Sequence, residues 1–178
     1  MERNESQAWL DSRAQFGIKL GLETMSRVLE RLGRPERATV GAHIAGTNGK
    51  GSTGAFLESI LRRAGFRTGF YSSPHLVRVN ERVRVGGLPI DDQSLARALT
   101  RVREAAEGLP APITYFEAMT AVAFLVFAQE KIDFAVVETG LGGRLDATNV
   151  LLPSVTIVTN VALDHREYLG ASHSAIAR

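Results

Sequence analysis

The residues with the clearest chemical potential form a glycine-rich segment around one lysine, Gly-Thr-Asn-Gly-Lys-Gly-Ser at positions 46–52. Residues 40–45 before it have the pattern of a short buried strand, and a helical pattern follows it. Glycines let backbone N–H groups close around an anion, and a helix N-terminus adds the positive end of its dipole. The segment therefore predicts a phosphate-binding loop, in which Lys50 reaches the β- and γ-phosphates and Ser52 or Thr53 lies near a magnesium ion.

This segment departs from the general phosphate-loop pattern. The residue five positions before Gly49 is Ile44 instead of glycine, and Gly51 separates Lys50 from the first hydroxyl. A simple turn between a strand and a helix is the alternative, and we favour the phosphate loop because the flanking elements are those that the mechanism requires. The helix is expected to carry one apolar stripe, formed by Phe56, Leu57, Ile60, Leu61 and Ala64.

Three more polar side chains follow apolar strands, and each has a structural alternative. Ser73 is either a ligand-binding hydroxyl or a turn residue. Glu138 ends a buried strand, where a carboxylate needs a partner, and that partner is either Mg²⁺ or Arg144. We favour the metal for Glu138. His165 lies in a loop, where a histidine is more often hydrogen-bonded than catalytic.

The order of the expected elements indicates an α/β fold. Strands are expected at residues 40–45, 67–71, 133–138 and 154–159, and helices follow Gly21, the N-cap Asp91 and Thr114. This alternation predicts a mostly parallel sheet with helices on both faces. Ligands of such sheets bind outside the carboxyl ends of the strands. The residues that follow these strands should therefore share one edge and form a metal–nucleotide site: Lys50, Ser73, Glu138 and His165.

Other segments are expected to be structural. Thr114 and Glu117 have the spacing of a capping box, which we favour over ligand contact. Valines alternate with polar residues over 77–85, which indicates a half-exposed hairpin outside the core sheet. Its arginines at 78, 82 and 84 are expected to face either solvent or a ligand, and we favour solvent. Residues 1–20 are polar, with only scattered apolar anchors.

Composition limits the class of protein. The 178 residues suggest one domain, and 44% hydrophobic with 22% charged residues is ordinary for a soluble globular protein. Cysteine is absent, which excludes disulfides and cysteine-bound metal. A net charge of +2 gives no argument for nucleic-acid binding. Because nothing resembles a signal peptide and the longest apolar run cannot span a bilayer, we expect a cytoplasmic protein without membrane contact.

Several motifs occur in an order that resembles a known family, the bifunctional dihydrofolate synthase/folylpolyglutamate synthases of the Mur ligase superfamily. They are the loop at 46–52, Tyr-Ser-Ser-Pro-His at 71–75, Glu-Arg-Val-Arg at 81–84, Thr-Tyr-Phe-Glu at 114–117, Glu-Thr-Gly-Leu-Gly-Gly-Arg-Leu-Asp-Ala-Thr-Asn at 138–149 and Leu-Asp-His at 163–165. The resemblance runs from about residue 16 to 178 and implies a three-layer, phosphate-loop Mur-ligase-like domain. It also accounts for the unusual form of the loop.

The resemblance implies a role for each motif. The ATP phosphates would be held by Thr47, Asn48, Gly49, Lys50, Gly51 and Ser52. Ser73, Glu138 and His165 match magnesium-binding positions of the family. The pterin substrate would be held by Lys19, Leu20, Thr114, Tyr115, Phe116, Glu117, Leu145, Asp146 and Ala147. Lys50, Glu138 and His165 would be the catalytic residues.

The implied reaction is ATP- and Mg²⁺-dependent ligation of L-glutamate to dihydropteroate or folates through an acyl phosphate, by a monomer. Because the family's carbamylated lysine and C-terminal glutamate-ligase domain lie beyond residue 178, we expect residues 1–178 to be a truncated N-terminal ATP-binding domain that does not complete the ligation. Two other functions are kept as alternatives. One is a non-catalytic nucleotide-binding module, and the other is a Mur ligase that acts on a cell-wall UDP-sugar precursor.

Overall fold

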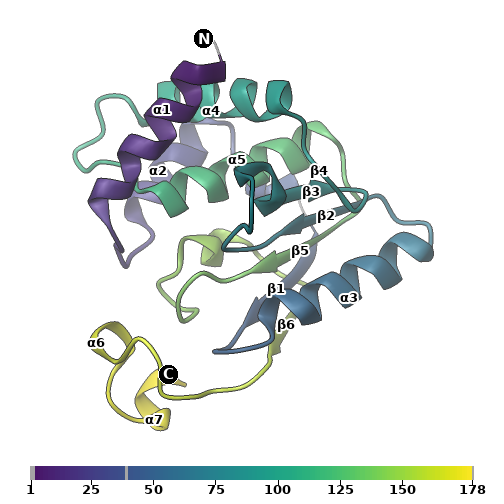
Figure 1. Cartoon of the computed structure of the whole chain (residues 1–178), viewed down its shortest axis with the longest axis vertical. Helices are drawn as coiled ribbons and strands as arrows, with labels where there is room; N and C mark the ends of the chain where they lie inside the picture. The colour runs from purple at the N-terminus through teal and green to yellow at the C-terminus, as the bar shows by residue number, and fades with distance from the viewer. Residues whose placement is uncertain (1–2, 39, 178) are drawn as a thin grey trace.

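A six-stranded sheet in the order β4-β3-β2-β5-β1-β6 forms the middle layer of the computed structural model, which describes residues 3–38 and 40–177 (Figure 1). Its central strands β2, β5, β1 and β6 are parallel, and β3 and β4 add an antiparallel edge. The strands are β1 (Gly41–Ala45), β2 (Thr68–Tyr71), β3 (Val83–Val85), β4 (Leu88–Pro89), β5 (Phe134–Glu138) and β6 (Val155–Val158).

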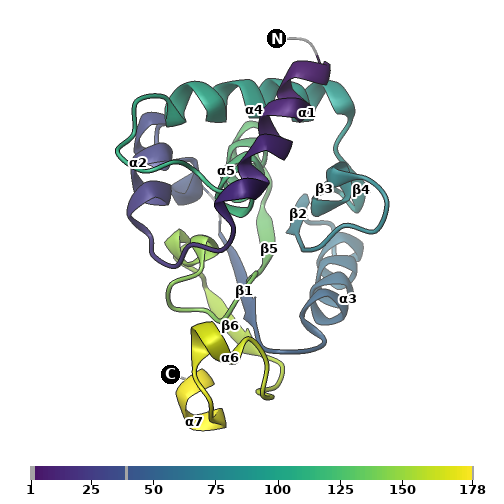
Figure 2. The same ribbon diagram turned by 60° about the vertical axis from the view of Figure 1, so that its left-hand side comes forward.

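Helices cover both faces of this sheet. One face carries α1 (Arg3–Ser12), α2 (Glu23–Arg31), α4 (Asp92–Ala106) and α5 (Tyr115–Gln129), and the other carries α3 (Lys50–Arg63) (Figures 1 and 2). After β6 the chain forms two single-turn helices, α6 (Arg166–Leu169) and α7 (His173–Ile176). The part of the chain that the structure describes also contains four 3₁₀ turns, at Arg13–Phe16, Pro35–Ala38, Val79–Arg82 and Ala147–Val150. Among the described residues, no helix has the length and apolar character needed to cross a bilayer.

The main core is organised around α5. This helix is apolar around nearly its whole circumference, because it packs between the sheet and the helices α1, α2 and α4. A smaller core of Ile44, Phe70 and Val136 lies beneath α3 on the opposite face. The core therefore fixes the carboxyl ends of β1, β2 and β5, where the phosphate-loop segment and Glu138 follow.

The structure confirms the four strands expected from the sequence and the helices after Gly21, Asp91 and Thr114. Asp91 caps α4 by accepting a hydrogen bond from the Ser94 N–H, and the Thr114–Glu117 capping box is present at α5. The alternation of strands and helices thus places a mostly parallel sheet between helical layers, as predicted.

Three expectations were wrong. Residues 3–12 form a helix, whose Leu10 is fully buried, instead of a polar segment with scattered anchors. Residues 79–82 form a 3₁₀ turn, so only the later part of the 77–85 segment is a strand. That strand, β3, pairs with β2 and buries Val83, so the hairpin extends the sheet instead of lying outside it. Burial against neighbours distant in the chain overrode the local patterns.

The apolar stripe predicted for α3 was also partly wrong. Leu57 and Leu61 pack on the small core, but Phe56 and Ile60 are 72% and 65% exposed. The helix instead buries Gly54 against the sheet, so closely that an added Cβ would lie 2.6 Å from the Phe70 ring. Its buried Glu58 accepts a hydrogen bond from Thr68 and pairs with Arg62.

Gly41 tests the close packing of β1 on β5. A Cβ at this position would lie 2.2 Å from the Ala135 carbonyl oxygen, a backbone atom that moves only with its strand. We expect Gly41→Ala to lower the free energy of unfolding by about 3 kcal/mol, measured by urea denaturation. Gly143→Ala is the matched control, because the nearest atom to its Cβ would be 3.9 Å away. Equal stability of the two variants would contradict this packing.

Candidate nucleotide and substrate site

The glycine-rich loop connects β1 to α3 in a conformation that only glycine adopts easily. Gly46 (φ 134°) lies against β6, where a Cβ would be 2.1 Å from the Thr159 hydroxyl. Gly49 (φ 81°) is the N-cap residue of α3, so the helix begins at Lys50. The 14-residue helix therefore directs its unpaired N–H groups and the positive end of its dipole toward the loop, as anion binding requires.

All six residues predicted to bind nucleotide line one cavity of about 490 Å³, which also contains Ser73 and Glu138. Lys50 bridges this cavity and a second one of about 270 Å³ that contains His165. Its Nζ donates hydrogen bonds to the Gly46 and Thr47 carbonyl oxygens, at 2.8 and 3.3 Å. The lysine is thus held over the loop between the two cavities.

Glu138 is a buried carboxylate that faces the nucleotide cavity. Its side chain accepts a 3.3 Å hydrogen bond from the Ser73 N–H. Burial raises the pKa of Glu138, while that hydrogen bond and the charge of Lys50 act in the opposite direction. A nearby cation stabilises the ionised form of such a carboxylate. The positive charge that lowers the pKa of Glu138 is that of Lys50 and not that of Arg144.

The predicted metal ligands come together only in part. Ser73 and Glu138 share the nucleotide cavity, whereas His165 lines the two neighbouring cavities. Among the described residues there is no cluster of three His, Cys, Asp or Glu side chains able to hold a metal ion. A hard cation that keeps several waters and binds substrate phosphates fits the oxygen atoms of Glu138 and Ser73. Glu138 and Ser73 therefore fit Mg²⁺, and His165 lies outside the cavity that they share.

A further cavity of about 250 Å³ adjoins the nucleotide cavity, and Ser73 and Pro74 line both. Of the nine residues predicted to bind the pterin, seven line this substrate cavity: Lys19, Leu20, Thr114, Phe116, Glu117, Asp146 and Ala147. Tyr115 lines a different cavity, because successive residues of a helix project about 100° apart. Leu145 does not line the substrate cavity, and its carbonyl oxygen accepts a hydrogen bond from the Gly21 N–H.

Glu117 has both roles that were considered for it, cap and cavity residue. One carboxylate oxygen accepts a 2.8 Å hydrogen bond from the Thr114 N–H and lies 3.0 Å from Lys19 Nζ. The other, Oε1, is buried and has no hydrogen-bond partner within the described residues. An unsatisfied buried carboxylate oxygen costs free energy unless a ligand donates to it. Glu117 is therefore suited to bind a ligand N–H group.

Comparison with known proteins agrees with this geometry. The family model of the Mur ligase middle domain matches residues 44–178. The chain belongs to the Mur ligase middle-domain family. This Mur ligase domain is 43% identical to the dihydrofolate synthase/folylpolyglutamate synthase of Bacillus subtilis and 44% identical to that of Escherichia coli, over 97% and 96% of its length. The resemblance inferred from the motifs is confirmed.

Solved structures show the same fold. Escherichia coli FolC in complex with DHPP and ADP superposes with a TM-score of 0.90 at 42% identity, covering 96% of this chain. A bifunctional folylpolyglutamate synthase/dihydrofolate synthase with Mn, AMPPNP and L-glutamate bound gives 0.87 at 40% identity. The Mur ligase domain described here spans about 40% of the length of these relatives.

Sequence reasoning missed two contributors to the site of this Mur ligase domain. Asn160 supports the glycine-rich loop, since its side chain and carbonyl oxygen accept hydrogen bonds from the Asn48 and Thr47 N–H groups. It directly follows a predicted strand, the same signal that selected His165. Arg82, for which solvent was favoured over a ligand, lines the substrate cavity. It donates to His75 Nδ1 at 2.9 Å and lies over the Tyr115 ring.

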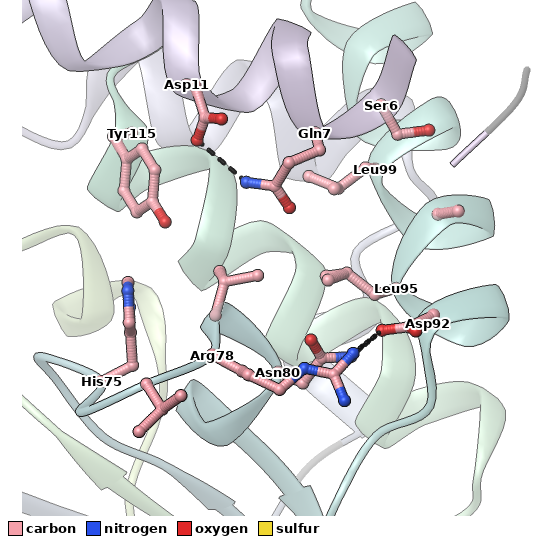
Figure 3. A pocket seen from close by; sticks show the side chains of 13 residues that line it. Ser6, Gln7, Asp11, His75, Arg78, Asn80, Asp92, Leu95, Leu99 and Tyr115 are labelled. Carbon is pink, nitrogen blue, oxygen red and sulfur yellow. Dashed lines mark hydrogen bonds and ion pairs between the residues drawn. The ribbon is translucent and has the colours of Figure 1, made fainter. Parts of the chain in front are cut away.

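Another cavity, of about 590 Å³, lies between α1, α4 and residues 75–80 (Figure 3). Tyr115 and His75 face it on one side, and the Arg78–Asp92 ion pair faces it on the other. It contains neither Lys50 nor Glu138.

Proposed function

We propose that the protein containing this chain is a ligase that uses ATP and Mg²⁺ to join L-glutamate to dihydropteroate, to folates or to both. The substrate carboxylate attacks the γ-phosphorus of ATP, which gives an acyl phosphate and ADP. The glutamate amine then attacks the acyl carbon, phosphate leaves and an amide remains. Because the chain spans about 40% of its relatives, the complete reaction is assigned to the full-length protein.

One observation carries the proposal: the nucleotide cavity and the substrate cavity meet at Ser73 and Pro74. A molecule bound in the substrate cavity can therefore present a carboxylate to a phosphate held by the glycine-rich loop. Holding two reactants in contact supplies much of the acceleration in phosphoryl transfer, which needs little covalent chemistry from the protein.

On the nucleotide side, the loop N–H groups and Lys50 would neutralise the phosphates, and Glu138 and Ser73 would hold Mg²⁺. When bound, Mg²⁺ offsets the charge that develops on the transferred phosphoryl group. Glu138 must be ionised to hold the cation, although its burial favours the neutral form. His165 faces both neighbouring cavities, which supports a role beside the reacting groups.

On the substrate side, Glu117 and Lys19 supply the specificity. A pterin ring carries an amino group and ring N–H groups that can donate to the unsatisfied Glu117 Oε1. Phe116 supplies an aromatic surface, and it packs so closely on Gly140 that a Cβ there would lie 2.6 Å from the ring. A planar, nitrogen-rich heterocycle suits this combination of apolar walls and one buried carboxylate.

The full-length protein tests the proposal directly. ATP-dependent phosphate release should require L-glutamate together with dihydropteroate or a folate, and the product should contain one new amide. A UDP-sugar precursor in place of dihydropteroate should give no release. Absence of turnover with ATP, L-glutamate and either acceptor, when ATP still binds, would favour the non-catalytic module instead.

Glu117→Gln tests the substrate side separately. Its amide keeps the volume but removes the charge that pairs with Lys19 and one acceptor oxygen. We expect the KM for dihydropteroate to rise about 30-fold, since a hydrogen bond to a charged group contributes about 2 kcal/mol. The KM for ATP should stay within twofold. A comparable rise for both substrates in steady-state kinetics would contradict this role.

A further inference from the structure

A buried histidine lies behind the site and belongs to none of the roles above. His43 is in the middle of β1 and is almost fully buried. Its Nε2 lies 2.7 Å from the hydroxyl oxygen of Thr148, a residue 105 positions later in the chain. The Thr148 hydroxyl donates its single proton to Asp146. His43 Nε2 must therefore carry a hydrogen and donate it to Thr148.

Asp146 links His43 and Thr148 to a second glycine-rich segment, residues 139–143, which follows β5. One carboxylate oxygen accepts hydrogen bonds from the Gly140 and Leu141 N–H groups, at 3.0 and 2.8 Å. The other accepts from the N–H and hydroxyl of Thr148. Both oxygens are thus used within the chain, so Asp146 acts on the loop more than on a ligand.

Gly140 and Leu141 form a wall between two cavities. Both residues line the cavity of about 270 Å³ that contains His165, and this cavity shares Thr47 and Lys50 with the nucleotide cavity. Both also line the substrate cavity. A displacement of this wall changes the shape of the two cavities at once. The position of the wall depends on Asp146, because its carboxylate accepts both of their N–H groups.

We propose that His43 and Thr148 are positioning residues, which hold this shared wall through Asp146 and so support the binding of nucleotide and pterin substrate together. The inference rests on the proposed function. Burial lowers the pKa of His43, which favours the neutral ring with a single N–H, although the Asp146 charge opposes this. The hydrogen-bond relay from His43 through Thr148 to Asp146 thus joins a central strand to Gly140 and Leu141, whose N–H groups donate to Asp146.

The consequence differs from that of a ligand contact. Loss of a contact residue such as Glu117 weakens the binding of one ligand. Loss of the relay loosens a wall common to both cavities, so the affinities for ADP and for dihydropteroate should fall together. The rate at saturation of all substrates should change much less, because the reacting groups are not removed.

Thr148→Val and Thr148→Ser are the matched variants, since valine keeps the shape without the hydroxyl and serine keeps the hydroxyl. In the full-length protein, we expect Thr148→Val to raise the Kd of ADP–Mg²⁺ and of dihydropteroate each about tenfold by calorimetry. Thr148→Ser should leave both within about twofold. Circular dichroism at the assay temperature checks that each variant is folded.

If Thr148→Val does not fold, His43→Leu and His43→Gln make the same comparison, because the glutamine amide can donate where Nε2 does. Unchanged affinities in a folded Thr148→Val protein, or a loss for one ligand alone, would overturn the positioning role. If the unaltered protein binds ADP but neither dihydropteroate nor a folate, the proposed function fails instead. The two failures are therefore distinguishable.

Discussion

Replacing Lys50 with alanine is expected to lower kcat/KM for ATP-dependent ligation by about 10³-fold in the full-length protein. Lys50 is the charged side chain of the glycine-rich loop, and it lies where the nucleotide cavity meets the cavity of His165. In the absence of ligand its ammonium group is held by the Gly46 and Thr47 carbonyl oxygens. Charge placed in advance at the phosphates acts without reorganisation during the reaction.

The control for this change is Lys131→Ala, a lysine that follows α5 far from the loop. Its kinetics should match those of the unaltered protein. Because Lys50 also holds two loop carbonyls, the Lys50→Ala protein should be compared by thermal unfolding as well, where we expect a small shift only. Full activity of folded Lys50→Ala would exclude the assigned role, and loss of both fold and activity would leave Lys50→Met as the next variant to measure.

Replacing Glu138 with glutamine is expected to raise the Mg²⁺ concentration needed for half-maximal activity by at least about tenfold. The amide keeps the shape of the side chain but loses the negative charge that attracts a hard cation. A magnesium titration of initial rates measures the effect. Asp133→Asn, a change at the opposite end of β5, is the control. A titration identical to that of the unaltered protein would leave Glu138 with a structural role only.

In the absence of metal, Glu138→Gln should increase the free energy of unfolding. Burial raises the pKa of Glu138, so its ionisation opposes folding. The protonated carboxyl is the form that favours folding. Its stabilising contribution is lost as the pH rises through the raised pKa of Glu138 in the folded state. Metal-free Glu138→Gln should therefore be more stable than the unaltered protein at pH 8, with the difference shrinking as the pH falls toward 5. Urea unfolding across that range measures it.

Much of the site followed from local sequence signals. Lys50 and Ser73 come after strands and Glu138 ends one, and parallel strands bring their carboxyl ends to one edge regardless of their separation in the chain. Asp91 and Thr114 were recognisable as caps because a capping hydrogen bond reaches only three residues. Such interactions are encoded over a few positions, so pattern and spacing suffice to predict them.

Which side chains are buried or line a cavity was decided by the tertiary structure, because it depends on residues distant in sequence. Phe56 and Ile60 have the spacing of a buried stripe, yet Gly54 determines which side of α3 meets the sheet. Arg82 lines the substrate cavity because His75 and Tyr115 hold it there, and His165 was separated from Glu138 by the path of the chain after β6. The sequence by itself determined which elements form and which residues end them, since hydrogen bonding and periodicity are local. The tertiary structure decided which side chains share a cavity, since packing joins residues such as His43 and Thr148 that no local pattern relates.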